Sequence, residues 1–333
     1  TYALNVATGN NARSHFSSTA LYSPTGLSGS QSASTVVLNW TASNPNNGNG
    51  YAISAEDNGT GNVCPATAAS YTTFVGGAAA SATTYTDSTS AMLLVTSGHY
   101  VCYLVQSAYD ASGAPPWASL PLWTSQTSLV TVAVKITQIA TRQSSAEATG
   151  GTSATATLGS NPVAGDLLVA EVITDVAYPA TPAGWTLAVQ ATGNAGRTGI
   201  YYQQNTAGGA TWKSVKFTCA TCTIVIAQMS EYTGASKTAA KDQTGSTVDN
   251  VNTNPFVVTA ASTAVQGDLS ITAITESVGV THSVTAPWAH IFNDVTNGTV
   301  ADRRLVTPSG ASSETVTGGS AVQWVGVIAT FQR

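Results

Sequence analysis

The chain has 333 residues and a net charge of −5, and only 8% of its residues are charged, against roughly 25% in typical soluble proteins. Without a basic stripe, the composition excludes nucleic-acid binding through a positive surface. No run approaches the roughly 18 apolar residues needed to span a bilayer, so we expect no membrane insertion. The length suffices for two or three domains with cores of their own.

The first 19 residues, TYALNVATGNNARSHFSST, precede the first recognisable domain. Tyr2, Leu4 and Val6 alternate with small or polar residues, which predicts a short strand with one apolar face. This strand could form an edge of the chain's own first domain. It could instead be donated to the sheet of a neighbouring subunit, where backbone hydrogen bonds would supply affinity. A third possibility is that the segment is disordered. The sequence starts at Thr1 with no charged n-region and no apolar h-region, so we expect a leader either to have been removed already or to lie outside this sequence.

Residues 20–133 resemble a fibronectin type III domain. The resemblance rests on LYSPTGLSGS (21–30), TVVLNWTAS (35–43), GYAIS (50–54) and SGHYVCYLVQSAYDASG (97–113), which correspond in order to four strands of that family. The resemblance implies a β-sandwich in which Trp40 is a core anchor. It also places Cys64 near Cys102, and a bridge between them would contribute about 3–4 kcal/mol.

Residues 134–333 contain a pattern that occurs twice. Val163–Val189 and Val265–Ile291 each begin with a Gly-Asp-Leu turn and a β-branched strand, and each then reaches a tryptophan, Trp185 or Trp288. We therefore expect one sandwich made of two similar halves, with both tryptophans in corresponding core positions. Asp166 and Asp268 are interpreted as turn residues and not as a catalytic pair.

Strand patterns fill this region, and no stretch shows helical periodicity. The predicted strands are 134–142, 152–158, 166–174, 185–191, 198–204, 213–218, 223–232, 255–260, 268–275, 287–293, 301–307 and 322–331. The run LVTVAVKITQIA (129–140) is predicted as one unbroken strand joining the two domains. The segments GDLLVAEV, PAGWTLAV, IYYQQN, EYTGASKTAAKDQTGS and AVQWVGVIATF resemble the jelly-roll modules of secreted and surface bacterial proteins. That resemblance implies an accessory or structural module.

The motif Cys219-Ala-Thr-Cys222 is the short motif that could carry chemistry. A redox pair would need a helix N-terminus in a βαβ setting, whereas this motif lies between two strand patterns. A metal site would need a second pair of ligands, which the sequence does not offer. A structural disulfide at a turn is the favoured interpretation, and four paired cysteines favour an exported protein.

Other polar residues were weighed as functional candidates. Glu171, Glu231 and Glu276 are candidate glycosidase carboxylates. Glu171 and Glu276 lie toward the ends of the two repeated strands, which suggests equivalent positions, and we expect these carboxylates to cap strands at the surface. The remaining candidates are Asp242, Asp249 and Asp294 for calcium, Tyr201, Tyr202 and Trp212 for sugar stacking, His282 and His290 as an adjacent pair, and Asn39, Asn58 and Asn297 as possible glycosylation sites. Each has a simpler interpretation as a surface, loop or core residue.

The sequence thus predicts an all-β protein of two tandem sandwich domains, without catalytic activity, cofactor or metal. The favoured function is a structural subunit of an extracellular or cell-surface filament, a homo-polymer assembled through the N-terminal strand. The alternative is a carbohydrate-binding or adhesive module that recognises surface glycans.

Overall fold

The computed structural model describes residues 23–32, 35–43, 50–88, 95, 97–108, 129–264, 268–305 and 310–333. Regular structure within these ranges is almost entirely β-strand, with two short 3-10 helices, η1 (Ala68–Ser70) and η3 (Ala210–Trp212). The all-β prediction is therefore confirmed. The predicted strand at Tyr2, Leu4 and Val6 lies outside the described residues.

The chain divides into two compact units. The first comprises Thr1–Ser30, Val37–Asp87 and Val101–Val134, and the second comprises Gln31–Val36, Ser88–Tyr100 and Lys135–Arg333. Each is described below by itself.

The first unit contains two sheets. One has the order β1-β2-β5 and the other β4-β3-β6-β7. The strands are β1 (Thr25–Ser32), β2 (Thr35–Thr41), β3 (Gly50–Asp57), β4 (Thr73–Ala79), β5 (Thr84–Asp87), β6 (Tyr100–Ala108) and β7 (Thr131–Lys135). Trp40 is buried, as the sequence predicts, and its ring meets that of Tyr51 edge-on at 5.3 Å. Cys64 is bonded to Cys102 of β6, the pair that the sequence led us to expect.

Two large sheets form the centre of the second unit. The first has the order β12-β13-β11-β15-β8, with β9 also paired to β15, and the second has the order β16-β23-β18-β21-β20. Their strands are β8 (Ala140–Ser144), β9 (Ala148–Gly150), β11 (Leu167–Thr174), β12 (Thr186–Gly193), β13 (Gly196–Gln203), β15 (Val225–Thr233), β16 (Lys241–Thr253), β18 (Leu269–Glu276), β20 (Ala289–Asp294), β21 (Thr299–Arg304) and β23 (Val322–Phe331).

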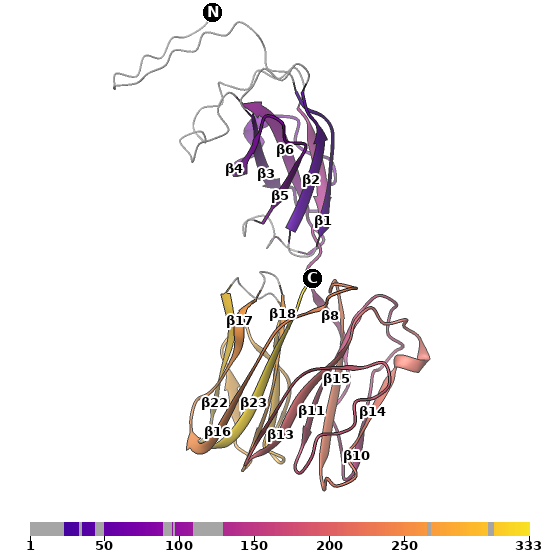
Figure 1. The fold of residues 1–333 in the computed structure, drawn as a ribbon, viewed down its shortest axis with the longest axis vertical. Helices are drawn as coiled ribbons and strands as arrows, with labels where there is room; N and C mark the ends of the chain where they lie inside the picture. The colour runs from indigo at the N-terminus through magenta and orange to yellow at the C-terminus, as the bar shows by residue number, and fades with distance from the viewer. Residues whose placement is uncertain are drawn as a thin grey trace, which may run out of the picture. The chain divides into compact units, whose positions relative to one another are not determined.

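Two small sheets cover the outer faces of the large ones. The pair β10 (Ser153–Thr157) and β14 (Ser214–Thr218) packs on the first large sheet, and β17 (Phe256–Ala264), β22 (Gly310–Gly318) and β19 (His282–Val284) pack on the second. Figure 1 shows these small sheets on opposite sides of the unit. A third apolar core, which includes Val169, Ile271 and Val327, lies between the two large sheets. The unit therefore has four β-layers enclosing three cores.

The two halves of the second unit match strand for strand. The order β12-β13-β11-β15-β8 in one large sheet corresponds to β20-β21-β18-β23-β16 in the other. Trp185 and Trp288 occupy the two outer cores, each with 8% of its surface exposed, so their predicted correspondence is confirmed. The repeated halves were expected to form one sandwich. The structure shows instead that each half is a sandwich of its own and that the two pack through their large sheets.

The strand predictions were wrong in two respects. The run 129–140 is not one strand, because β7 ends at Lys135 and β8 starts at Ala140. Ile136 and Ile139 in the interruption are buried, so their apolar character reflects core packing and not strand continuity. Four strands of the second unit, β9, β16, β19 and β22, were missed. The strands β16 and β22 are rich in Thr, Ser, Gly and Asn and show little apolar alternation, and β9 and β19 have only three residues each.

Candidate functional site

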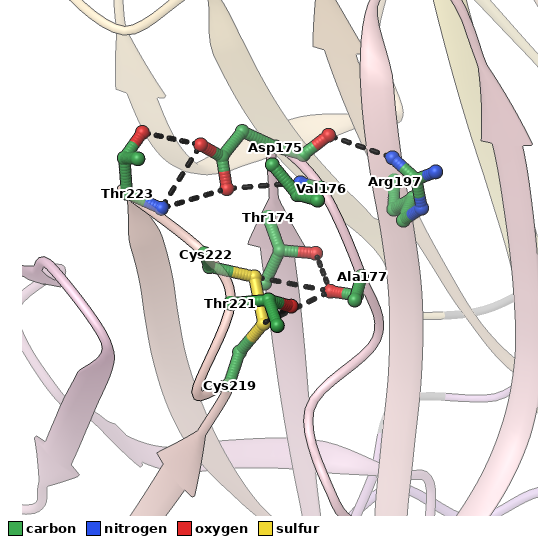
Figure 2. Close-up of a disulfide and its surroundings, with 9 residues drawn as sticks. All are labelled: Thr174, Asp175, Val176, Ala177, Arg197, Cys219, Thr221, Cys222 and Thr223. Atoms are coloured by element: carbon green, nitrogen blue, oxygen red, sulfur yellow. Dashed lines mark hydrogen bonds between the residues drawn. A yellow bond between two sulfur atoms is a disulfide. The ribbon is translucent and has the colours of Figure 1, made fainter.

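The Cys219-Ala-Thr-Cys222 motif forms a disulfide in the turn between β14 and β15. Figure 2 shows both sulfurs beside the carbonyl oxygen of Ala177, at 3.4 Å and 3.2 Å. Cys219 and Cys222 are 3% and 4% exposed and belong to the outer core of the first half. The structure places no helix at this motif. The disulfide closes the turn itself, and its sulfurs pack against the loop at Ala177.

Asp175 fixes the same turn from the neighbouring loop. Its carboxylate accepts hydrogen bonds from the backbone N–H of Thr223, at 3.0 Å, and from the Thr223 hydroxyl (Figure 2). Arg197 donates to the backbone oxygen of Asp175 at 2.7 Å. Partial burial opposes ionisation, but the bonds from Thr223 lower the pKa of Asp175 on balance. These contacts hold the turn in place and leave no nucleophile free.

Buried carboxyl groups are the most unusual feature of the molecule. Of the 15 Asp and Glu residues in the described ranges, eight are buried: Asp87, Asp166, Glu171, Glu231, Asp268, Glu276, Asp302 and Glu314. Carboxylates are rarely buried without a partner, because desolvation penalises their charge. The expectation that Glu171, Glu231 and Glu276 lie at the surface is therefore wrong.

The register also separates Glu171 from Glu276. Leu167 and Leu269 start the equivalent strands β11 and β18. Four residues further on, Glu171 in one strand corresponds to Ala273 in the other. Glu276 ends its strand and corresponds to Thr174. The two glutamates are therefore not a symmetry-related pair.

Asp302 and Glu314 meet in the outer core of the second half. Asp302 lies on β21 and Glu314 on β22, and both have no exposed surface. The Thr272 hydroxyl donates to Glu314 Oε2, and His290 Nδ1 contacts Asp302 Oδ1. Asp302 Oδ2 and Glu314 Oε1 receive no hydrogen bond from a donor group, and the two carboxyls interact with one another. A proton placed between these two oxygens would satisfy both.

The charges in this cluster follow from its burial. Burial first, and then the neighbouring charge of Asp302, raises the pKa of Glu314 well above its ordinary value. Its bond to Asp302 raises the pKa of His290, which keeps 31% of its side-chain surface exposed. We therefore assign the proton to Glu314 and the positive charge to His290 in mildly acidic solution.

A second histidine is held close to this cluster. His282 lies between Asn293 Oδ1, at 2.7 Å, and Glu276 Oε1. The side chains of His282 and Glu276 have no exposed surface. Burial opposes charging of His282, but the bonds to Glu276 and Asn293 raise its pKa on balance. The sequence identified His282 and His290 as neighbours but did not indicate their carboxyl partners.

The first half contains a third cluster, around Arg142. The Nε of Arg142 lies 2.6 Å from Asp166 Oδ2 and 3.4 Å from Glu231 Oε1. Glu231 also accepts the backbone N–H of Val163 at 2.7 Å and the side-chain amide of Gln143 at 2.5 Å. Asp166 follows a turn, as predicted. Its side chain, however, forms an ion pair, which the turn motif did not reveal.

Glu171 stands alone in the central core. It points to the same face of β11 as Leu167, Val169 and Ile173, into the layer between the two large sheets. Neither of its carboxyl oxygens has a hydrogen-bond partner. Burial raises its pKa to about 8, and the charge of Arg303 opposes that shift.

The predicted aromatic platform is not formed. Tyr201 is buried against Phe217, with ring centroids 5.0 Å apart, whereas Tyr202 packs on Phe331 from the opposite face of its strand. Trp212 lies over Gly184. No group of three or more His, Cys, Asp and Glu side chains in the described ranges has an arrangement that could hold a metal.

The three possible calcium ligands have other partners. Asp249 accepts the Thr253 hydroxyl and the backbone N–H of Val251, and Asp294 caps its own turn by accepting the amide of Asn297. Asp242 accepts the side-chain amide of Gln243 at 3.0 Å and that of Gln332 at 3.3 Å.

The glycosylation candidates differ in exposure. Asn39 is exposed on β2. Asn58 and Asn297 are half-buried, and their side-chain amides donate to Gly61 O and to Asp294. Asn39 is therefore the most accessible of the three.

The fold and these clusters define a layered all-β protein that is closed by disulfides and rich in buried carboxyls. No family model, no curated protein and no solved structure matches the chain. Two disulfides indicate folding in an oxidising environment outside the cytoplasm. Across the described residues, no helix has the length and apolar character that a membrane crossing needs.

Proposed function

We propose that the protein is a structural subunit of an extracellular or cell-surface filament. The observation that carries this proposal is the burial of eight of the 15 acidic side chains that the structure describes. A chain with only 8% charged residues thereby removes these eight acidic groups from the surface. Low surface charge reduces repulsion between copies and favours close association.

The architecture of the second unit also suits a load-bearing role. Four packed layers bury both faces of the central strands, and every residue of β11 and β18 is buried. Antiparallel sheets held by three cores and a disulfide have few sites where local opening can begin.

The sequence supplies a means of joining subunits. The N-terminal TYALNVA alternates apolar and small or polar residues, a pattern suited to adding a strand to the open edge of a sheet. In this proposal Tyr2, Leu4 and Val6 fill pockets of the next copy. The resemblance of residues 20–133 to fibronectin type III domains and of 134–333 to jelly-roll modules agrees with a structural part.

Negative-stain electron microscopy tests the proposal. The full chain should form filaments, and deletion of residues 1–10 should leave a folded monomer with the circular dichroism spectrum of a β-protein. A combined Tyr2→Ser, Leu4→Ser, Val6→Ser variant should lose filaments as well. The matched control replaces Ala3, Asn5 and Ala7 on the other strand face with Ser and should keep them.

The same experiment separates the alternative function. If the full chain stays monomeric at every concentration and binds immobilised glycans, the protein is a binding module and the filament proposal fails. If filaments persist without residues 1–10, the subunits join by another surface.

A further inference from the structure

We propose that the second unit is locked by protons that its buried carboxyl groups hold only in the folded state, so that the protein is built to stay folded in acidic surroundings. The geometry behind this proposal is a contact between two acids, Asp302 and Glu314, without enough positive charge to neutralise both. A second contact between acids, that of Glu147 with Asp294, and the partnerless buried Glu171 should make stability depend on pH in the same direction.

The side chains around Asp302 and Glu314 determine how much positive charge opposes the negative charge of the two carboxyls. From β18 the pair meets the uncharged Thr272, and from β20 it meets His290. The strands β17 and β23, which enclose the same core, contain no charged or titratable residue.

Two further basic side chains lie nearby, but each is engaged with another carboxyl group. From β19, His282 is nearby, but it is already bonded to Glu276 at the end of β18. Arg303, next to Asp302 along β21, interacts with Glu171 in the central core. His290 is therefore the cation in hydrogen-bond contact with the pair, and His282 adds only a charge interaction with Asp302.

The net charge of this cluster depends on pH. With His290 positive and one proton shared between Asp302 and Glu314, the cluster is neutral. Loss of both protons leaves two negative charges in a core that contains Trp288 and Val316. Such a core solvates two adjacent anions poorly, so alkaline conditions should open this part of the fold.

Two further sites should also make stability fall as pH rises. Glu147, which precedes β9, interacts with Asp294 at the end of β20, and burial together with that contact raises the pKa of Glu147 to about 7. The groups around this pair, Thr149 and Asn297, carry no charge. Glu171 in the central core has Arg303 and Tyr232 as its charged or titratable neighbours. The Asp166–Glu231 pair differs, because Arg142 bonds to both carboxyls.

The carboxyl groups and histidines with raised pKa values all make stability fall as pH rises. A carboxyl whose folded pKa is raised holds a proton that the unfolded chain has released, so stability falls as pH rises from about 4.5. A histidine whose pKa is raised stabilises fully below about 6.5 and loses that contribution at higher pH. Asp175 and Asp294, whose pKa values are lowered, limit stability only below about pH 3.8. Stability should therefore be greatest near pH 4–5.

The test is denaturant unfolding of the full chain between pH 3 and pH 9. The folding equilibrium constant of the wild type should fall between pH 5 and pH 8, by up to about tenfold per pH unit for each extra proton held. Glu314→Gln, which imitates the protonated acid, should remove about one proton from this slope and raise stability at pH 8. Asp249→Asn, at a half-exposed site on β16, is the control and should keep the wild-type slope.

A rise in wild-type stability from pH 5 to pH 8 would overturn the proposal, as would an unchanged slope in Glu314→Gln. If that variant does not fold, infrared spectroscopy of the wild type decides. The carbonyl stretch of a protonated carboxylic acid should persist at pH 7, and it should be reduced in Asp302→Asn. Its absence at pH 7 would sink the idea. None of these outcomes depends on whether the protein forms filaments.

Discussion

Replacing Glu171 by methionine should stabilise the protein, and more so as pH rises. The carboxyl is fully buried and its pKa is raised to about 8 from 4.5. Linkage converts this shift into a cost of about 3 kcal/mol at pH 7 and about 1 kcal/mol at pH 5. Neither oxygen has a partner, which adds about 1–3 kcal/mol even for the neutral acid. Methionine removes both costs and nearly preserves the volume.

Urea unfolding of the wild type and of Glu171→Met at pH 5 and pH 7 measures both contributions. The variant should gain at least about 3 kcal/mol at pH 7, or roughly 10 °C in Tm for a unit of this size. The gain should shrink by about 2 kcal/mol at pH 5. Ala273, at the equivalent position of β18, shows that an apolar residue fits this layer. A variant less stable than the wild type would refute the reasoning, because Glu171 would then be a required partner of Arg303.

Two further predictions concern covalent and apolar contributions. Replacing Cys64 and Cys102 with Ala should cost about 4 kcal/mol, whereas replacing Cys219 and Cys222 should cost about 1–2 kcal/mol, because the second bridge spans three residues instead of 38. Equal losses in denaturant unfolding would contradict this entropic account. Trp288→Ala should cost about 3–5 kcal/mol, since the side chain is 8% exposed and fills an outer core. A loss below about 1 kcal/mol would show that this core rearranges freely.

Periodicity and the repeated motif were enough to predict much of the fold. The strands 166–174 and 268–275 were predicted within one residue of β11 and β18, since their β-branched residues form continuous apolar runs. The strand β22, GASSETVTG, was missed because its buried alternation consists of Ser, Glu and Val. A short polar strand carries little apolar signal, so hydropathy alone does not reveal it.

Less of the candidate site could be predicted from the sequence, because the site depends on contacts between strands that are distant along the chain. Asp302 and His290 lie on neighbouring strands, but Glu314 reaches them from the opposite sheet. Nothing in the local sequence of Glu314 indicates which sheet it faces. The pairing of Cys219 with Cys222 was predictable because both residues lie within one turn.

Glu171 was predicted to be exposed, and the packing of the two large sheets against one another explains why it is buried. In an isolated half, the face of β11 that contains Glu171 would be the solvent face of a single sandwich. Packing the two large sheets against one another covers that face with β18 and β23, and with it Val169, Ile173 and Glu171. An isolated first half would therefore expose an apolar surface but would release Glu171 to water. The halves depend on one another through this layer, and its buried acid makes their association weaker at high pH.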